Sequence, residues 1–155
     1  MCKGGNLMLH SLLSTPDDLL LTFLRVILGV VLFAHGAQKM LGWFGGPGLQ
    51  KTLGTFKQYL GIPAPLALLA VVAEFFGGLG LIVGLLSRVA AFGVGFTMLI
   101  AALKVHLRHG LFINWSGEQQ GHGFEFHLLA IAMAAAIIVH GAGALSLDAI
   151  LSQMI

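Results

Sequence analysis

Ionisable and amide side chains interrupt two long apolar stretches of this sequence. They are Arg25, His35, Gln38 and Lys39 in the stretch 19–41, and Glu74 in the stretch 66–86. Charged groups in hydrocarbon are energetically expensive, so such residues pair with one another or serve binding and proton transfer. A lone carboxylate such as Glu74 must therefore pair with a cation or take up a proton.

Each of these residues has a structural interpretation beside a functional one. Glu74 could form a structural ion pair with Arg25, Lys39 or Arg88, or it could handle a ligand or protons. Arg25 and Lys39 lie near opposite ends of their stretch, so they either face the bundle interior or extend to the lipid headgroups. His35 either bonds a backbone carbonyl in the core or belongs to a site.

Histidines in the second half of the chain raise the question of metals and haem. His106 and His109 share a helix face, but no further ligand motif accompanies them, so we expect no metal site. Paired histidines can also bind haem in a four-helix membrane bundle. The candidates His35, His106, His127 and His140 are not obviously matched in depth, which disfavours haem.

Composition indicates the class of protein. The 155 residues are 57% hydrophobic and 9% charged, with a mean hydropathy of +0.95, whereas soluble domains carry about 25% charged residues. This pattern excludes a soluble globule and a disordered chain, and indicates an integral membrane protein. The net charge of +2 comes from few groups and does not indicate nucleic acid binding. The single cysteine, Cys2, excludes an internal disulfide and a dithiol site.

Four apolar stretches are long enough to be membrane-spanning helices, at about 20 residues each. They lie at about 19–41, 66–86, 89–107 and 124–144. We predict an all-α fold, a four-transmembrane-helix antiparallel bundle forming one domain over residues 1–155. A short interfacial helix is expected in the segment 48–61, after the first span.

Local signals mark how the helices begin and end. Thr15 is the expected cap of the first span, with Pro16 at its first helical position. Residues 7–13 look like an interfacial lead-in rather than a cleaved signal peptide. Ser146 is expected to begin a short C-terminal helix. Both termini should therefore share one side of the membrane, with the two longer loops on the other.

The antiparallel arrangement predicts that polar groups converge beneath the two long loops. They are His35, Gln38, Lys39, Glu74, His106, Glu125 and His127, with Trp43, Phe44, Phe112 and Trp115 nearby. A half-buried polar pocket with an aromatic rim suits a small amphipathic molecule such as a quinone. Each aromatic residue could equally belong to an ordinary interfacial belt.

Several short motifs, in order, resemble the DoxX family of small membrane proteins. The matching pieces are Leu24-Arg25, Gly29, Phe33, His35-Gly36, Lys39, GWFGGPGL at 42–49, GIP at 61–63, AEFFGG at 73–78, GLLSRVAA at 84–91, VHLRHGLF at 105–112, GFE at 123–125 and GAGALSLDAIL at 141–151. This resemblance covers about residues 20–151.

The resemblance implies four transmembrane helices in a bacterial-type inner (plasma) membrane. The family is similar to a membrane subunit of thiosulfate:quinone oxidoreductase, and related members are linked to membrane oxidoreductase complexes, thiol stress and quinone resistance. The polar positions that match are Arg25, His35, Lys39, Glu74, Arg88, His106 and Glu125. Cys2 matches no family motif.

Our first hypothesis is a membrane subunit of, or accessory to, a quinone-linked oxidoreductase. Glu74, His106 and His35 are the candidate catalytic residues, which would handle protons at a quinone. Candidate ligand-binding residues are Arg25, Lys39, Gln38, Glu125, Trp43 and Trp115. Electrons would come from a redox partner subunit or a bound cofactor. The sequence leaves open whether the chain forms a homo-oligomer.

Two alternatives use the same residues differently. In a membrane anchor or assembly factor, the buried charges would only hold the bundle together. A small transporter is less favoured, because four spans leave little room for alternating access. Five basic residues on the long-loop side, against three on the terminal side, favour long loops inside the cell.

Overall fold

The chain is all-helical in the computed structural model, which describes residues 3–118 and 120–154. Its elements are α1 (Lys3–Leu13), α2 (Leu19–Met40), η1 (Trp43–Gly45), α3 (Gly48–Leu60), α4 (Ala64–Val83), α5 (Ser87–Ala101), η2 (Ala102–His106), η3 (Leu107–His109), α6 (Glu125–His140) and α7 (Leu147–Ser152). The part of the chain that is described contains no strand. Cys2, and with it the prediction about disulfides, lies outside the described residues.

Three helices are long and apolar enough to cross a membrane. They are Leu19–Met40 with 22 residues, Ala64–Val83 with 20, and the continuous segment Ser87–His109 with 23. The first three expected spans are thus confirmed as helices of sufficient length, with ends that differ by a few residues.

The fourth expected span is shorter than predicted. Helix α6 has 16 residues, which at 1.5 Å per residue reach about 24 Å, against a hydrocarbon core of about 30 Å. The apolar residues 141–144 do not continue the helix, because Gly141 and Gly143 adopt φ values of 99° and 84°. The four-span arrangement therefore stays a prediction.

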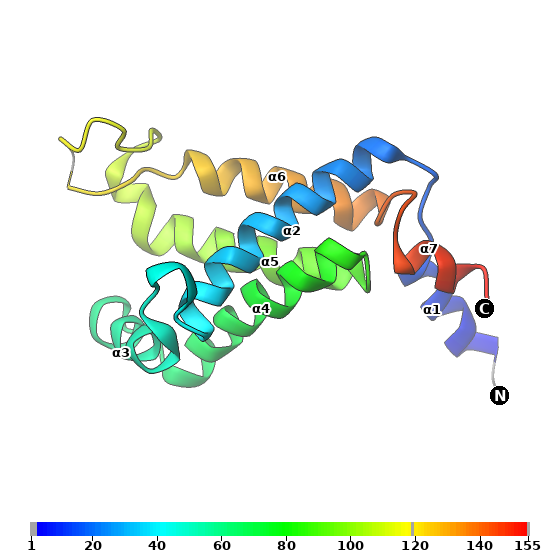
Figure 1. The fold of residues 1–155 in the computed structure, drawn as a ribbon, viewed down its shortest axis with the longest axis horizontal. Coiled ribbons are helices and arrows are strands. Elements are labelled where there is room, and N and C mark those ends of the chain that lie inside the picture. The colour runs from blue at the N-terminus through cyan, green and yellow to red at the C-terminus, as the bar shows by residue number, and fades with distance from the viewer. Residues whose placement is uncertain (1–2, 119, 155) are drawn as a thin grey trace.

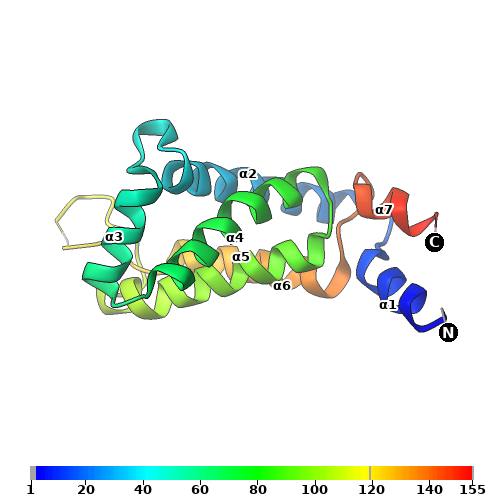
Figure 2. The same cartoon turned by 90° about the horizontal axis from the view of Figure 1, so that it is seen from below.

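Helices α2, α4, α5 and α6 form an elongated bundle with distinct ends (Figures 1 and 2). Both termini lie at one end, beside α1 and α7, which we call the terminal end. Helix α3 and the loop 110–123 lie at the opposite end, which we call the loop end. The expectation that both termini share one side of the membrane stays a prediction. Helix α3 also forms where the interfacial helix is expected.

Helices α2 and α4 pack backbone against backbone. A Cβ atom added to Gly36 would lie 2.5 Å from Phe75 Cα, and one added to Gly29 would lie 2.8 Å from Ile82 N. Gly78 contacts the backbone of Phe33 in the same way. Small residues that let backbones approach closely are typical of membrane helix pairs. The apolar core continues from this pair into α5 and α6 through Leu28, Leu32, Leu81, Ala91, Val94, Met98, Ala130, Ala134 and Ile137.

The cap of the first span differs from the prediction. Asp18, not Thr15, is the N-cap of α2, and its carboxylate accepts from Leu20 N at 2.7 Å and Leu21 N at 3.1 Å. The Thr15 hydroxyl instead accepts from Gly143 N at 2.6 Å, so it joins the N-terminal segment to the end of α6. Ser146 caps α7, as expected, by accepting from Ala149 N.

Candidate functional site

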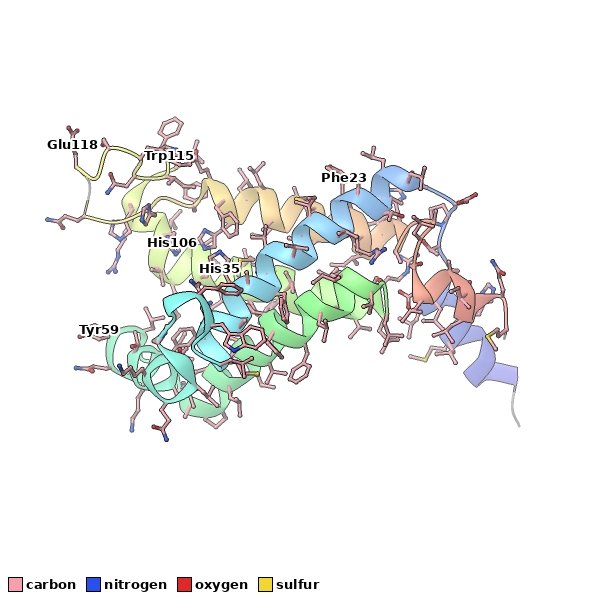
Figure 3. The ribbon with its side chains drawn as sticks, viewed as in Figure 1. Phe23, His35, Tyr59, His106, Trp115 and Glu118 are labelled. Atoms are coloured by element: carbon pink, nitrogen blue, oxygen red, sulfur yellow. The ribbon has the colours of Figure 1, made fainter. Side chains whose placement is uncertain are left out.

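A cavity of about 440 Å³ lies at the loop end of the bundle. Its polar lining residues are His35, Lys39, Glu74, His106, His122 and His127. Its apolar wall includes Met98, Ala101, Ile113 and Phe126. Figure 3 shows His35 and His106 in this half of the molecule, while Phe23 lies toward the terminal end. The cavity thus combines an apolar wall with a few hydrogen-bonding groups, as small-molecule sites do.

An ion pair between α2 and α4 forms the most polar part of the cavity. Lys39 Nζ lies 2.6 Å from Glu74 Oε1 and 2.5 Å from Oε2. The Glu74 side chain is only 2% exposed, whereas that of Lys39 is 29% exposed. Of the three partners considered for Glu74, the structure therefore selects Lys39. Because a buried carboxylate is costly without its cation, the pair fixes both side chains at the cavity.

Two histidine rings lie against each other on the other side of the cavity. The His106 and His127 ring centroids are 4.1 Å apart, with a tilt of 35°. His106 Nδ1 lies 2.8 Å from the carbonyl oxygen of His122. A carbonyl can only accept, so this bond assigns the proton to His106 Nδ1 and leaves Nε2 as an acceptor in the neutral ring. The site therefore contains a histidine with a defined tautomer.

His127 is the most deeply buried histidine of the cavity. It is 8% exposed, and its Nδ1 is buried without a hydrogen-bond partner within the described part of the chain. Buried polar atoms in proteins are nearly always satisfied, so an unsatisfied one calls for an explanation such as a ligand or an unseen water. Phe126 packs against the His127 ring at 5.5 Å. The ring is therefore held in place by aromatic contacts.

A short π-helix carries His106 into the site. The segment Ala102–His106 follows α5 directly and makes π-type turns. One extra residue per turn rotates the side chains that follow, and such π segments occur frequently at functional sites. Here the π-helix ends at His106 itself, beside the cavity.

The base of the loop formed by residues 110–118 and 120–123 lines the cavity through Ile113, His122 and Gly123. The base of this loop is closed by backbone bonds from Gly123 N to Phe112 O at 3.0 Å and from Glu125 N to Leu111 O at 2.9 Å. The Glu125 carboxylate accepts from Ile113 N at 3.0 Å. Glu125 thus supports this loop and does not line the cavity.

The structure brings four of the predicted site residues together. His35, Lys39, Glu74 and His106 all line the cavity, whereas Gln38, Glu125, Trp43 and Trp115 do not. Trp43 and Trp115 are exposed, and Trp115 projects from the outer loop (Figure 3). His127, expected among the converging polar groups, also lines the cavity, and so does His122, to which the sequence assigned no role. For His127, its place near the expected start of the fourth span was the available signal.

Arg25 lies away from the cavity, toward the terminal end. It is fully buried and does not extend to headgroups. Its guanidinium donates to Ala142 O at 2.7 Å, Ile82 O at 2.9 Å, Leu145 O at 2.5 Å, and also to Leu81 O. Arg25 therefore satisfies carbonyls at the C-terminal end of α4 and in the connection from α6 to α7, which gives it a structural role.

Two further ionic groups stabilise the terminal end. The Asp148 carboxylate accepts from Leu86 N at 2.7 Å and Ser87 N at 2.8 Å, where it caps the start of α5. Arg88 donates to Val139 O and Ile138 O at the end of α6, and to Ser14 O. These contacts explain why charged residues occur at this end without forming a second site.

Metal ligation finds no support in the arrangement of the side chains. Among the residues whose placement is described, no group of three or more His, Cys, Asp or Glu side chains could hold a metal ion.

An all-helical bundle with three membrane-capable helices and a polar cavity at one end defines a helical membrane protein. A family model described as DoxX matches residues 20–107, more than half of the 155 residues. The chain therefore belongs to the DoxX family, as the sequence motifs indicated. No curated protein and no solved structure matches it. The match includes His35, Lys39, Glu74 and His106, while the resemblance over residues 108–151 stays a prediction.

Proposed function

We propose that this chain is a membrane subunit of, or accessory to, a quinone-linked oxidoreductase system, and that its cavity binds a small amphipathic ligand such as a quinone. The cavity at the loop end carries the proposal. Its volume of about 440 Å³ lies in the range of small-molecule sites. The cavity combines an apolar wall with the Lys39–Glu74 pair and four histidines.

The residues present fit a quinone. Its two ring oxygens accept hydrogen bonds, for which Lys39 Nζ and the imidazole N–H groups are suitable donors. His127 offers a polar atom without a partner in the described structure. Phe126 and Met98 would contact the ring faces. A bound quinone would supply the electron-accepting chemistry.

Within this scheme the side chains bind, orient and move protons. Glu74, held by Lys39, is the proposed proton-handling acid. His106, with one proton on Nδ1, would hold a second proton on Nε2 and pass it to a quinone oxygen as the ring takes up electrons. His35 contacts the same ligand from α2. Electrons would come from a redox partner subunit or a bound cofactor, because the single cysteine supplies no dithiol.

The proposed setting is a bacterial-type inner membrane. We infer that α6, together with the residues that flank it, completes a fourth crossing, which would keep both termini on one side. Basic residues at the loop end favour this end as the cytoplasmic one. A reporter fused after Ile155 would report the side of the C-terminus.

Equilibrium titration of the purified protein in lipid nanodiscs with a short-tailed quinone tests the proposed function. We expect saturable binding that Glu74→Gln weakens at least about tenfold. The variant loses the charge-assisted contact that holds Lys39 Nζ at the cavity, and the loss of such a contact costs about 1.5–3 kcal/mol. Glu118→Gln is the matched control, because Glu118 is exposed on the outer loop (Figure 3). It should leave the affinity unchanged.

Two results would contradict this proposal in different ways. Absence of saturable binding by the unmodified protein would reject the ligand site altogether. Tight binding that Glu74→Gln leaves unaltered would reject the role of the carboxylate.

A second candidate function, a membrane anchor or assembly factor, is favoured by the terminal end. There Arg25, Arg88 and Asp148 all bond backbone groups and hold elements together. If Glu74 were equally structural, Glu74→Gln would lower thermal stability without a binding phenotype. Capture of partners from native membranes separates the two, since redox subunits would support the first function.

A further inference from the structure

The loop side of the cavity is formed by the hydrogen-bonded base of a loop, which contributes Ile113, His122 and Gly123. Residues 110–118 and 120–123, which we call the loop cover, are tied down at Phe124 N to Gly110 O, at Ile113 N to the Glu125 carboxylate, and at His106 Nδ1 to His122 O. A Cβ atom on Gly123 would lie 2.5 Å from two carbonyl oxygens, so the closure is tight. Opening this side to water would break several of these bonds together.

The contact between α2 and α4 is equally closed. The close approach of Gly36 and Gly29 to the backbone of α4 leaves no room between these helices. On the opposite side of the bundle, α5 packs on α6 with Gly95 beside Ala134. Entry between either pair would require separating closely packed backbones.

The contact between α2 and α6 is different. These helices meet over a much shorter stretch than α2 with α4 or α5 with α6, and they diverge toward the loop end (Figure 1). His35 on α2 and Phe126 on α6 face each other there, with ring centroids 5.8 Å apart. Both line the cavity, and His35 is exposed whereas Phe126 is half-buried. This pair is thus the side-chain boundary between the cavity and the surroundings of the helices.

We propose that the ligand enters the cavity sideways from the bilayer, between α2 and α6, through a portal formed by His35 and Phe126. This inference rests on the proposed function and specifies its ligand class: a ring compound dissolved in the membrane, such as a tailed quinone, rather than a solute from water. His35 lies inside the apolar helix Leu19–Met40, so the portal opens at membrane depth. The His35 imidazole offers a hydrogen bond to the ring oxygens during passage.

Exchange kinetics of a radiolabelled, decyl-tailed quinone between nanodiscs test the portal. Phe126→Ala should accelerate association about tenfold, because opening a gate lowers the barrier to entry, whereas losing a contact in the bound state accelerates dissociation alone. Ile113→Ala is the matched control, since Ile113 lines the same cavity from the loop cover. It should leave the association rate within about twofold, whatever its effect on dissociation.

His35→Ala provides a second variant that should fold normally, because the side chain is exposed. We expect it to accelerate exchange in the same direction. Faster exchange with Ile113→Ala but not with Phe126→Ala would overturn the portal in favour of entry through the loop cover. Equal rates in all four proteins would overturn it too. Absence of saturable binding in the unmodified protein would instead reject the proposed function, and the portal with it.

Discussion

Arg25→Met is expected to lower the free energy of unfolding by at least about 4 kcal/mol. The guanidinium satisfies four backbone carbonyls in a fully buried setting, and each buried group left without a partner costs about 1–3 kcal/mol. Effects above about 4 kcal/mol are uncommon and arise from the loss of such buried networks. Chemical denaturation of the purified protein in detergent, followed by circular dichroism, measures the change.

The matched control for Arg25 is Arg108→Met. Arg108 is exposed at the loop end, where its Nε bonds only the neighbouring His109 among the contacts described. Substitutions of exposed residues usually change the free energy of unfolding by less than about 0.5 kcal/mol. Arg25→Lys, which keeps the charge but loses the guanidinium fork, should fall between the two. Equal stability of Arg25→Met and Arg108→Met would disprove the structural role of Arg25.

Lys39→Met should destabilise the protein by about 3–5 kcal/mol, the cost of leaving one member of a buried pair without its partner. Glu74 is almost fully buried and both of its carboxylate oxygens bond Lys39, so the variant leaves the carboxylate without its cation. The double variant Lys39→Met/Glu74→Gln removes the unpaired charge and should recover at least half of the loss. A double-mutant cycle in the same denaturation assay measures the coupling.

Quinone binding adds a readout that stability alone does not give. Both Lys39→Met and the double variant should lose at least about tenfold in affinity, equal to about 1.4 kcal/mol, because both remove the cationic donor from the cavity. Restored stability together with restored affinity in the double variant would show that the pair serves only the fold. Additive losses in the cycle would instead show that the two side chains do not interact.

Much of this fold follows from the sequence. Long apolar runs specify helices of membrane length, and the antiparallel order of those helices brings His35, Lys39, Glu74 and His106 to one end. Helix capacity to cross a membrane depends on length and apolar content, both of which are local properties. The apolar tail of the fourth stretch was misleading, because hydropathy does not register that Gly141 and Gly143 leave the helix.

The site was less predictable than the fold, because its contacts depend on how the helices pack against one another. Arg25 and Lys39 are both cations in one apolar helix, yet one bonds backbone carbonyls and the other pairs with Glu74. Which cation reaches the carboxylate depends on how α2 and α4 are aligned through Gly36 and Gly29. Residue spacing within one helix does not predict this alignment between two helices. Glu125 likewise has the chemistry of a ligand-binding residue but supports the loop cover.

His122 illustrates a different limit. Its backbone carbonyl, not only its side chain, contributes to the site by fixing the tautomer of His106. A backbone contact carries no sequence signature, so nothing in the chain marked residue 122 beyond its place in a polar loop. The sequence placed His127 among the converging polar groups, but its ring contact with His106 is a tertiary feature.

Photolabelling with an azidoquinone in nanodiscs, followed by mass spectrometric peptide mapping, tests the central claim most directly. If the cavity is the quinone site, the label should concentrate on segments 35–39, 98–106 and 122–127, and excess unlabelled quinone should displace it. The second groove of the bundle, lined by Phe76, Gly80 and Ala90 between α4 and α5, is the internal control. Label concentrated in that groove, or spread over the lipid-facing residues and not displaceable, would contradict the account.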